Sequence, residues 1–151
     1  VGVDSAHEKE SMTNLLHTAV SIRKPNSKII VLLGAEGGGR DKAKRPLMGE
    51  ISAKLAEYVI VANVDPYEDD PKEIIEDIAI VAEKFGKIRN KDLFTIEDRK
   101  TAIEKAFELA KTDDIVLITG KGAEQSMIID GRSIPWDDRK VVRSILIANK
   151  K

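Results

Sequence analysis

The stretch that decides the fold is "KIIVLLG" at residues 28–34, which runs into "AEGGGRDKAKRP" at residues 35–46. A short, almost continuous run of Ile, Val and Leu is typical of a strand that is covered on both faces. The glycines that follow allow a tight turn, and Pro46 suits the first turn of a helix. A buried strand that leads through a glycine-rich loop into a helix is the repeating unit of a parallel α/β sheet.

Three further apolar runs, at residues 58–63, 93–97 and 114–120, repeat this pattern, with a helical pattern before each of them. A weaker pair of runs, "SMIID" and "RSIPW", flanks Gly131 and predicts a hairpin or a short sheet edge. We therefore expect an α/β fold in which a mostly parallel, twisted sheet of about six strands is flanked by helices, as in Rossmann-like domains.

The helical segments carry start and stop signals. Asp70 is a suitable N-cap, Pro71 fits the first helical position, and Glu73 would complete a capping box. Gly86 stands where a glycine often ends a helix, and a second helix is predicted to start at Asp98. The side chains predicted to be buried are Ile74, Ile78, Val81, Ala82 and Phe85 in the first helix, and Ala102, Ile103, Ala106, Phe107 and Ala110 in the second. Further helices are expected over residues 8–20, 45–57 and 137–150.

The composition indicates a single domain over residues 1–151, with 42% apolar and 34% charged residues. The net charge of -1 gives no general attraction to nucleic acid. Cysteine is absent, which fits a reducing compartment and excludes disulfides. The longest apolar run is far below the ~20 residues that span a bilayer, and no signal peptide is visible. We therefore expect a cytoplasmic protein that binds neither nucleic acid nor membrane.

The loops after the four parallel strands carry the polar chemistry. Ligands of open α/β sheets bind beyond the carboxyl ends of the strands, so the loops 34–45, 63–70, 97–98 and 120–125 should line one site. The first is rich in glycine and cations, the second in carboxylates, and the fourth holds Lys121 and Glu124 in "GKGAEQ". Backbone amides and arginine side chains of such loops can hold an anion. The residues by themselves indicate an anion-binding α/β domain.

Other interpretations of these residues remain open. The glycine-rich turn is also compatible with a plain tight turn, and the acids of loop 63–70 with a solvated loop. Neither the GxxxxGK[ST] phosphate loop nor the GxGxxG fingerprint fits this sequence. His7 has no partner at metal-binding spacing, and His17 is best explained as a packing or surface residue. No catalytic residue and no metal site can be assigned.

Six segments, taken in order, resemble motifs of the C-terminal domain of Mur ligases, most of all the MurE type, which adds an amino acid to UDP-N-acetylmuramoyl-dipeptide. The segments are "VDSAHEKES" (3–11), "GAEGGGRDKAKRPLMGEI" (34–51), "NVDPYEDDPKEII" (63–75), "EDRKTAI" (97–103), "GKGAE" (120–124) and "IPWDDRKVV" (134–142). Each motif alone is weak evidence. Their common order and spacing over the whole chain make the resemblance specific.

The resemblance implies a three-domain enzyme of peptidoglycan synthesis, and hence of cell-wall biogenesis, cell shape and cell division. Its N-terminal domain holds the UDP-sugar peptide, and its central domain binds most of the ATP and Mg²⁺. The C-terminal domain brings the incoming amino acid, whose amine attacks an acyl phosphate, and closes over the nucleotide. The expected partners are UDP-MurNAc-dipeptide, the amino acid, ATP and the enzyme's own central domain. Val1 stands about where the central domain would end. Because the chain contains no P-loop and no evident magnesium site, it should be inactive by itself.

The resemblance also implies roles for single residues. Arg40 matches the arginine that binds the carboxylate of the incoming amino acid, and Gly120 and Glu124 match positions that contact its side chain. Asp4 matches a residue that hydrogen-bonds the ATP ribose, with His7 nearby. Lys44 and Arg45 match the family's "KRP" and would face a phosphate or another anion, or cap the loop. Ser5 and Ala123 depart from the family's usual Tyr and His.

The loop after the second strand indicates which amino acid is added. In MurE enzymes that use meso-diaminopimelate this loop reads "DNPR", and its arginine holds the second carboxylate of the substrate. The matching stretch here is "VDPY", with Asp65 in place of Asn and Tyr67 in place of Arg. The resemblance therefore predicts a diamino acid without a second carboxylate, L-lysine first and ornithine next.

Two alternatives to this ligase remain at the level of sequence. One is an independent anion- or nucleotide-binding module without catalysis, and the other is a related amide ligase such as folylpolyglutamate synthetase. The "RDKAKRP" and "GKGAE" loops favour the MurE type over the second alternative. A Walker-type segment upstream in the gene would separate the ligase from the binding module.

Overall fold

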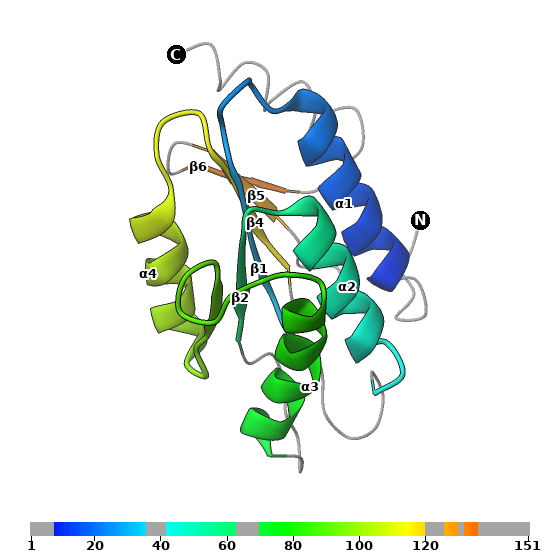
Figure 1. Cartoon of the computed structure of the whole chain (residues 1–151). Coiled ribbons are helices and arrows are strands. Elements are labelled where there is room, and N and C mark those ends of the chain that lie inside the picture. Colours follow the sequence, from blue (N-terminus) through cyan, green and yellow to red (C-terminus); the bar gives the residue numbers. More distant parts are fainter. Residues whose placement is uncertain (1–7, 36–41, 63–69, 120–125, 130–131, 136–151) are drawn as a thin grey trace.

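The structure is a computed structural model that describes residues 8–35, 42–62, 70–119, 126–129 and 132–135. The described segments form one sheet with helices on both of its faces (Figure 1). In chain order the elements are α1 (Glu8–Ile22), β1 (Ile29–Leu33), α2 (Arg45–Leu55), β2 (Tyr58–Val61), α3 (Pro71–Lys84), β3 (Leu93–Thr95), α4 (Arg99–Leu109), β4 (Ile115–Ile118), β5 (Ser126–Ile129) and β6 (Arg132–Pro135). The predicted alternation is confirmed, and the helix expected over 137–150 lies outside the described residues.

The sheet has six strands in the order β3-β2-β1-β4-β5-β6. The strands β3, β2, β1 and β4 are parallel, whereas β5 is antiparallel to β4 and β6 is antiparallel to β5. The predictions of about six strands and a mostly parallel sheet are therefore confirmed. The two weak apolar runs around Gly131 form the antiparallel pair that ends the sheet.

The chain changes direction across the sheet after β3. The strands β2 and β3 add successively to one side of β1, and the connection through α4 then returns the chain to the other side of β1 as β4. The carboxyl ends of β1 and β4 are thus neighbours from which the chain departs in different directions. Such a reversal of strand order is where open α/β sheets place their ligands.

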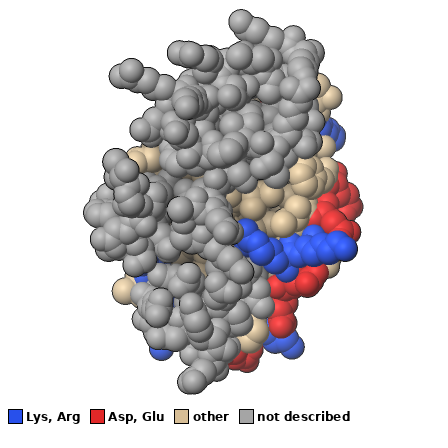
Figure 2. All heavy atoms as spheres, turned by 180° about the vertical axis from the view of Figure 1, so that it is seen from behind, with Lys and Arg blue, Asp and Glu red and all other residues tan. Residues whose placement is uncertain are grey.

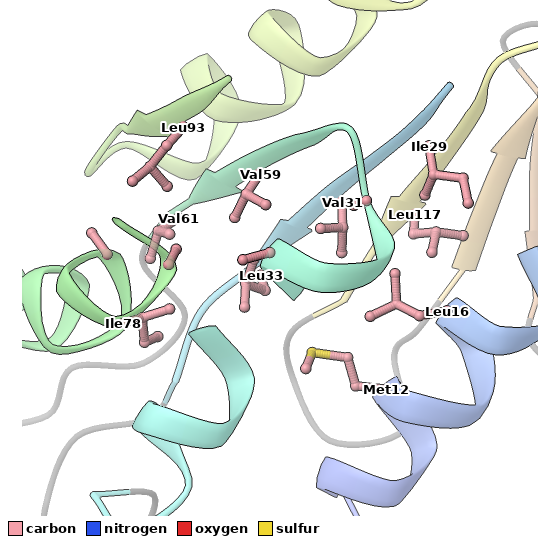
Figure 3. Packing of buried hydrophobic residues seen from close by; sticks show 14 of the residues in the cluster. Met12, Leu16, Ile29, Val31, Leu33, Val59, Val61, Ile78, Leu93 and Leu117 are labelled. Carbon is pink, nitrogen blue, oxygen red and sulfur yellow. The ribbon is translucent and has the colours of Figure 1, made fainter. Parts of the chain in front are cut away.

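One face of the sheet is covered by α1, α2 and α3. Ile29, Val31 and Leu33 of β1 point to this face, because alternate residues of a strand share a side. Figure 3 shows Leu16 of α1 and Ile78 of α3 directed toward this layer of strand side chains. All five are fully buried, so this face forms the larger of the two cores.

The opposite face packs against α4. Ile30 and Leu32 of β1 lie there together with Ile60, and Ala102 and Ala106 of α4 cover them. Since both faces are covered, every residue of β1 is buried, as its unbroken apolar sequence predicts.

The predicted helix caps are confirmed, with one change of partner. The Asp98 carboxylate accepts a hydrogen bond from the Thr101 backbone amide at 2.9 Å. The Asp70 carboxylate accepts from the Lys72 amide at 3.0 Å, not from the Glu73 amide that a capping box would use. Glu73 instead donates its amide to the backbone carbonyl of Asp70. Gly86 follows α3 with a φ of 101°, which a glycine adopts readily.

Two aromatic side chains that were predicted to be buried are exposed. Phe85 is 43% exposed and Phe107 is 41% exposed. The helix α3 ends at Lys84, so Phe85 is its C-cap and leaves the apolar stripe; its ring lies under the Lys54 ammonium, 4.9 Å from the ring centroid. In α4 the buried positions are Ala102 and Ala106, and Phe107 stands about 100° further round the helix.

The helices α2 and α3 approach each other at Gly49. A Cβ atom added there would lie 2.5 Å from the carbonyl oxygen of Ile78 and 3.0 Å from the Cβ of Val81. No real Cβ atom comes so near to backbone. The position therefore needs glycine for close helix packing, although glycine is unfavourable inside a helix.

Gly49→Ala tests this close contact. The gain in helix propensity is about 1 kcal/mol, but overpacking a core typically costs about 1–3 kcal/mol, and here the obstacle is backbone. We expect a net loss of about 1–2 kcal/mol in the free energy of unfolding, measured by urea titration. Leu47→Ala, at an exposed position of the same helix, should change it by less than about 0.5 kcal/mol. A Gly49→Ala protein that is more stable than the wild type would contradict the contact.

Two carboxylates fix the amino ends of the strands. One Glu57 carboxylate oxygen accepts from the Ile29 amide at 2.7 Å and from Nη1 of Arg23 at 2.8 Å. The Asp114 carboxylate accepts from the backbone amides of Lys28 at 2.8 Å and Lys111 at 2.9 Å. These side chains tie the starts of β1, β2 and β4 to the turns and the helix end beside them.

Candidate functional site

Thr119 links the carboxyl ends of β1 and β4 through two hydrogen bonds. Its amide donates to the carbonyl of Leu32 at 3.0 Å, and its hydroxyl donates to the same oxygen at 2.9 Å. The strand pairing itself ends with Leu32 opposite Ile118. The glycine-rich loop that starts at Gly34 and the "GKGAE" loop that starts at Gly120 therefore leave the sheet side by side.

The loops after β2 and β3 start from the same edge. The amide of Ala62 donates to Leu33 and that of Ile96 to Val61, each at 2.9 Å, so the carboxyl ends of β1, β2 and β3 are in line. Arg99, the first residue of α4, reaches the end of β4, where its Nη2 donates to the carbonyl of Thr119 at 3.1 Å. The expectation that the four loops share one sheet edge is confirmed at their described ends.

Most of the predicted site residues lie beyond those described ends. Outside the described residues are Asp4, His7, Arg40, Asp65, Tyr67, Gly120 and Glu124. The structure describes Lys44 and Arg45 and the strand ends from which the loops depart. It thus supplies the frame of the site and leaves the roles of those seven residues as predictions.

Lys44 and Arg45 open α2 and lie in different surroundings. Lys44 is the N-cap residue and is half-buried. Arg45 is only 2% exposed, and its Nη1 lies 2.7 Å from the Asp77 carboxylate of α3. This ion pair joins α2 to α3. This ion pair could not be predicted from the sequence, because the two residues are 32 positions apart.

A separate open groove of about 290 Å³ lies at the β3 edge of the sheet. The first turns of α3 contribute Ile75 and Glu76 to it, and the end of β3 contributes Thr95; Lys72 and Glu97 complete the lining. Two hydrogen bonds from Arg89, at 2.7 and 3.0 Å, hold the Glu76 carboxylate. This groove lies two strands away from the junction of β1 and β4, and sequence reasoning did not find it.

Arg89, which precedes β3, and Asp98, the N-cap of α4, have shifted pKa values. The Glu76 carboxylate, and then that of Glu83, raises the pKa of Arg89 by bonding to its charged form, although partial burial opposes the shift. The hydroxyl and the amide of Thr101 donate to Asp98 and lower the pKa of that carboxyl. Asp98 therefore stays ionised at the start of α4, where a negative charge favours the helix.

Charges of both signs are mixed on the described surface. Figure 2 shows blue and red side chains next to one another on this face of the molecule. Among the described residues, no cluster of three or more His, Cys, Asp or Glu side chains is placed to hold a metal ion. Within the same segments, no helix is both long and apolar enough to cross a membrane.

The chain is similar to known ligases. The family model described as "Mur ligase, glutamate ligase domain" matches residues 1–122. The UDP-N-acetylmuramoyl-L-alanyl-D-glutamate–2,6-diaminopimelate ligase of Caldanaerobacter subterraneus is 40% identical over 100% of this chain and 30% of its own length. The ligase of that name from Aquifex aeolicus is 41% identical over 95% of this chain and 28% of its own length. The UDP-N-acetylmuramyl-tripeptide synthetase of Treponema denticola is 42% identical over 96% of this chain and 27% of its own length.

A solved structure of a UDP-N-acetylmuramoyl-L-alanyl-D-glutamate–2,6-diaminopimelate ligase contains a region with a fold similar to that of this chain. It superposes with a TM-score of 0.62 at 32% identity, and the match covers 97% of this chain and 28% of that one. The chain thus spans about 30% or less of the length of these relatives. The family model covers most of the chain and the fold agrees, so this chain belongs to the Mur ligase family, with MurE-type ligases as its relatives.

Proposed function

We propose that this chain is the amino-acid-binding, C-terminal domain of an ATP-dependent ligase that adds the third amino acid to UDP-N-acetylmuramoyl-dipeptide in the cytoplasm. The observation that carries the proposal is the junction of β1 and β4. There the glycine-rich basic loop and the "GKGAE" loop leave the sheet from adjacent residues, at its reversal of strand order. Two loops of this composition suit a small ligand that carries a carboxylate.

Arg40 supplies the group that orients the amino acid in this proposal. A guanidinium matches the planar carboxylate with two parallel hydrogen bonds, and the neighbouring glycines let the ligand approach the backbone. Gly120 and Glu124 then contact the side chain. Held in this way, the free amine faces the activated carboxyl group of the dipeptide, forms the C–N bond and displaces phosphate. The domain contributes mainly proximity and orientation.

ATP and Mg²⁺ are proposed to bind mainly outside this chain. The 151 residues contain no GxxxxGK[ST] sequence, and the described residues form no cluster suited to a metal ion. When bound, ATP and Mg²⁺ would supply the activation of the carboxyl group. Asp4 and His7 are proposed to contact the nucleotide from this domain, and Lys44 to face an anion. The burial of Arg45 and its ion pair with Asp77 support a structural role for Arg45.

A chimeric ligase tests the proposed function. In the Aquifex aeolicus ligase, this chain replaces the matching 28% of the sequence. We expect ATP-dependent formation of UDP-linked tripeptide, followed by mass spectrometry, whereas this chain by itself should give background. The positive control is the same chimera built with the matching segment of the Caldanaerobacter subterraneus ligase.

The other outcomes separate the alternatives. If the control chimera is active and ours is folded but inactive with every diamino acid offered, an independent binding module is the better explanation. If our chimera instead adds glutamate to UDP-N-acetylmuramoyl-dipeptide in place of a diamino acid, a relationship to the folylpolyglutamate type of ligase is the better explanation.

A further inference from the structure

The segment "EDR" (97–99) has no part in the proposed function so far, yet it reaches the centre of the site. Arg99 is half-buried at the start of α4, and its Nη2 donates to the backbone carbonyl of Thr119, 20 residues later. This bond spans from the connection after β3 to the end of β4. In the sheet these two strands are separated by β2 and β1.

Thr119 is the last residue before Gly120, and both its backbone amide and its backbone carbonyl are hydrogen-bonded. It is buried, and its amide and hydroxyl both donate to the Leu32 carbonyl of β1. The backbone carbonyl of Thr119 accepts a hydrogen bond from the Arg99 guanidinium. Because that carbonyl belongs to the peptide bond that leads into Gly120, its direction sets the direction in which the next loop departs.

The base from which Arg99 extends is rigid. Asp98 caps the helix through both the amide and the hydroxyl of Thr101, at 2.9 and 2.7 Å. Ala102, one turn further on, is fully buried against the sheet. The backbone that carries Arg99 is thus already ordered, so only side-chain freedom is lost when the guanidinium binds its acceptor.

We propose that Arg99 is a positioning residue, which orients the loop that carries Gly120 and Glu124 by fixing the carbonyl of Thr119 against β1. This inference rests on the proposed function, in which that loop contacts the side chain of the incoming amino acid. In this role Arg99 acts through Thr119 and not through a contact with the substrate. Its loss should therefore weaken the binding of the amino acid and spare the binding of ATP.

The test uses the active chimera. Arg99→Ala should raise the KM for the amino acid about tenfold, as expected when a charged hydrogen bond is lost, and should change the KM for ATP less than about twofold. Arg99→Lys should recover much of the loss, because an ammonium can donate a single bond to a carbonyl. Thr119→Val, which removes the hydroxyl and keeps the side-chain shape, should give a smaller rise of the same kind.

Lys100→Ala, at the exposed neighbouring position, is the matched control and should behave like the wild type. A general loss of stability would instead lower kcat, change both KM values and reduce the melting temperature. Unchanged amino-acid kinetics in Arg99→Ala would overturn the inference. If Arg99→Ala does not fold, Arg99→Met decides, because it keeps the aliphatic stem and removes the donor to the Thr119 carbonyl; no selective rise in its amino-acid KM would equally overturn the inference. Failure of the wild-type chimera to make tripeptide would refute the proposed function instead.

Discussion

Arg40→Ala in the chimeric ligase should raise the KM for the incoming amino acid by tens- to about a hundredfold, and leave the KM for ATP nearly unchanged. The loss of a charged hydrogen bond in a partly buried site costs roughly 2–3 kcal/mol, which corresponds to that range. The selectivity is expected because Arg40 belongs to the loop that follows β1, and this loop leaves the sheet at the junction with β4 where the amino acid is proposed to bind. Steady-state kinetics with each substrate varied in turn provide the measurement.

The matched variants for this prediction are Arg40→Lys and Lys42→Ala. Lysine keeps the charge but lacks the planar guanidinium, so Arg40→Lys should restore little of the affinity for the amino acid that Arg40→Ala loses. Lys42 is an exposed cation two residues later in the same loop, and its removal should have a much smaller effect. An Arg40→Ala enzyme with wild-type amino-acid kinetics, or one equally impaired for ATP, would refute the carboxylate-binding role.

L-Lysine should be added in large excess over meso-diaminopimelate when both are offered at equal concentration. Asp65 and Tyr67 stand where the diaminopimelate enzymes have Asn and Arg, so the second carboxylate of diaminopimelate loses its cation and meets an acid. An unpaired carboxylate next to Asp65 or Glu124 in a site without water would cost several kcal/mol, which is about a hundredfold or more. Mass spectrometry of the tripeptide product gives the ratio directly.

Two relatives at 40% and 41% identity are named as diaminopimelate ligases, so overall similarity favours the opposite outcome. The double variant Asp65→Asn/Tyr67→Arg restores the Asn and the Arg of the family motif, and its product distinguishes these two expectations. It should shift the product toward diaminopimelate if these two residues select the substrate. An excess of diaminopimelate product from the unaltered loop would show that the interpretation of Tyr67 is wrong.

The elements of the fold were predictable because each has a local signal. The apolar runs gave all six strands, and Asp70 and Asp98 gave the starts of α3 and α4. Phe85 was misassigned because the helical period was continued one residue beyond the true end of α3. The strand order was not predictable. Alternation of strands and helices requires parallel neighbours, but it does not say on which side of β1 the strand β4 is added.

The candidate site was predictable only as a set of loops at one edge. Which side chains meet there depends on contacts between distant segments, such as Arg45 with Asp77 and Arg99 with Thr119. Neither pair has a periodic or compositional signature in the sequence. The motif resemblance supplied roles for the loop residues, and the structure supplied the bond from "EDR" that the motif alone does not explain.

The anchoring of the strands by Glu57 and Asp114 has a consequence for how such a domain can evolve. Both carboxylates act at the amino ends of the strands, the edge opposite to the loops. Substitutions and insertions in the loops therefore leave these anchors and both cores untouched, and should seldom unfold the protein. New loop sequences, such as one with Tyr67 in place of Arg, can therefore arise in evolution with little effect on folding. Selection for a different amino acid can then act on the loops alone, while the scaffold is inherited unchanged.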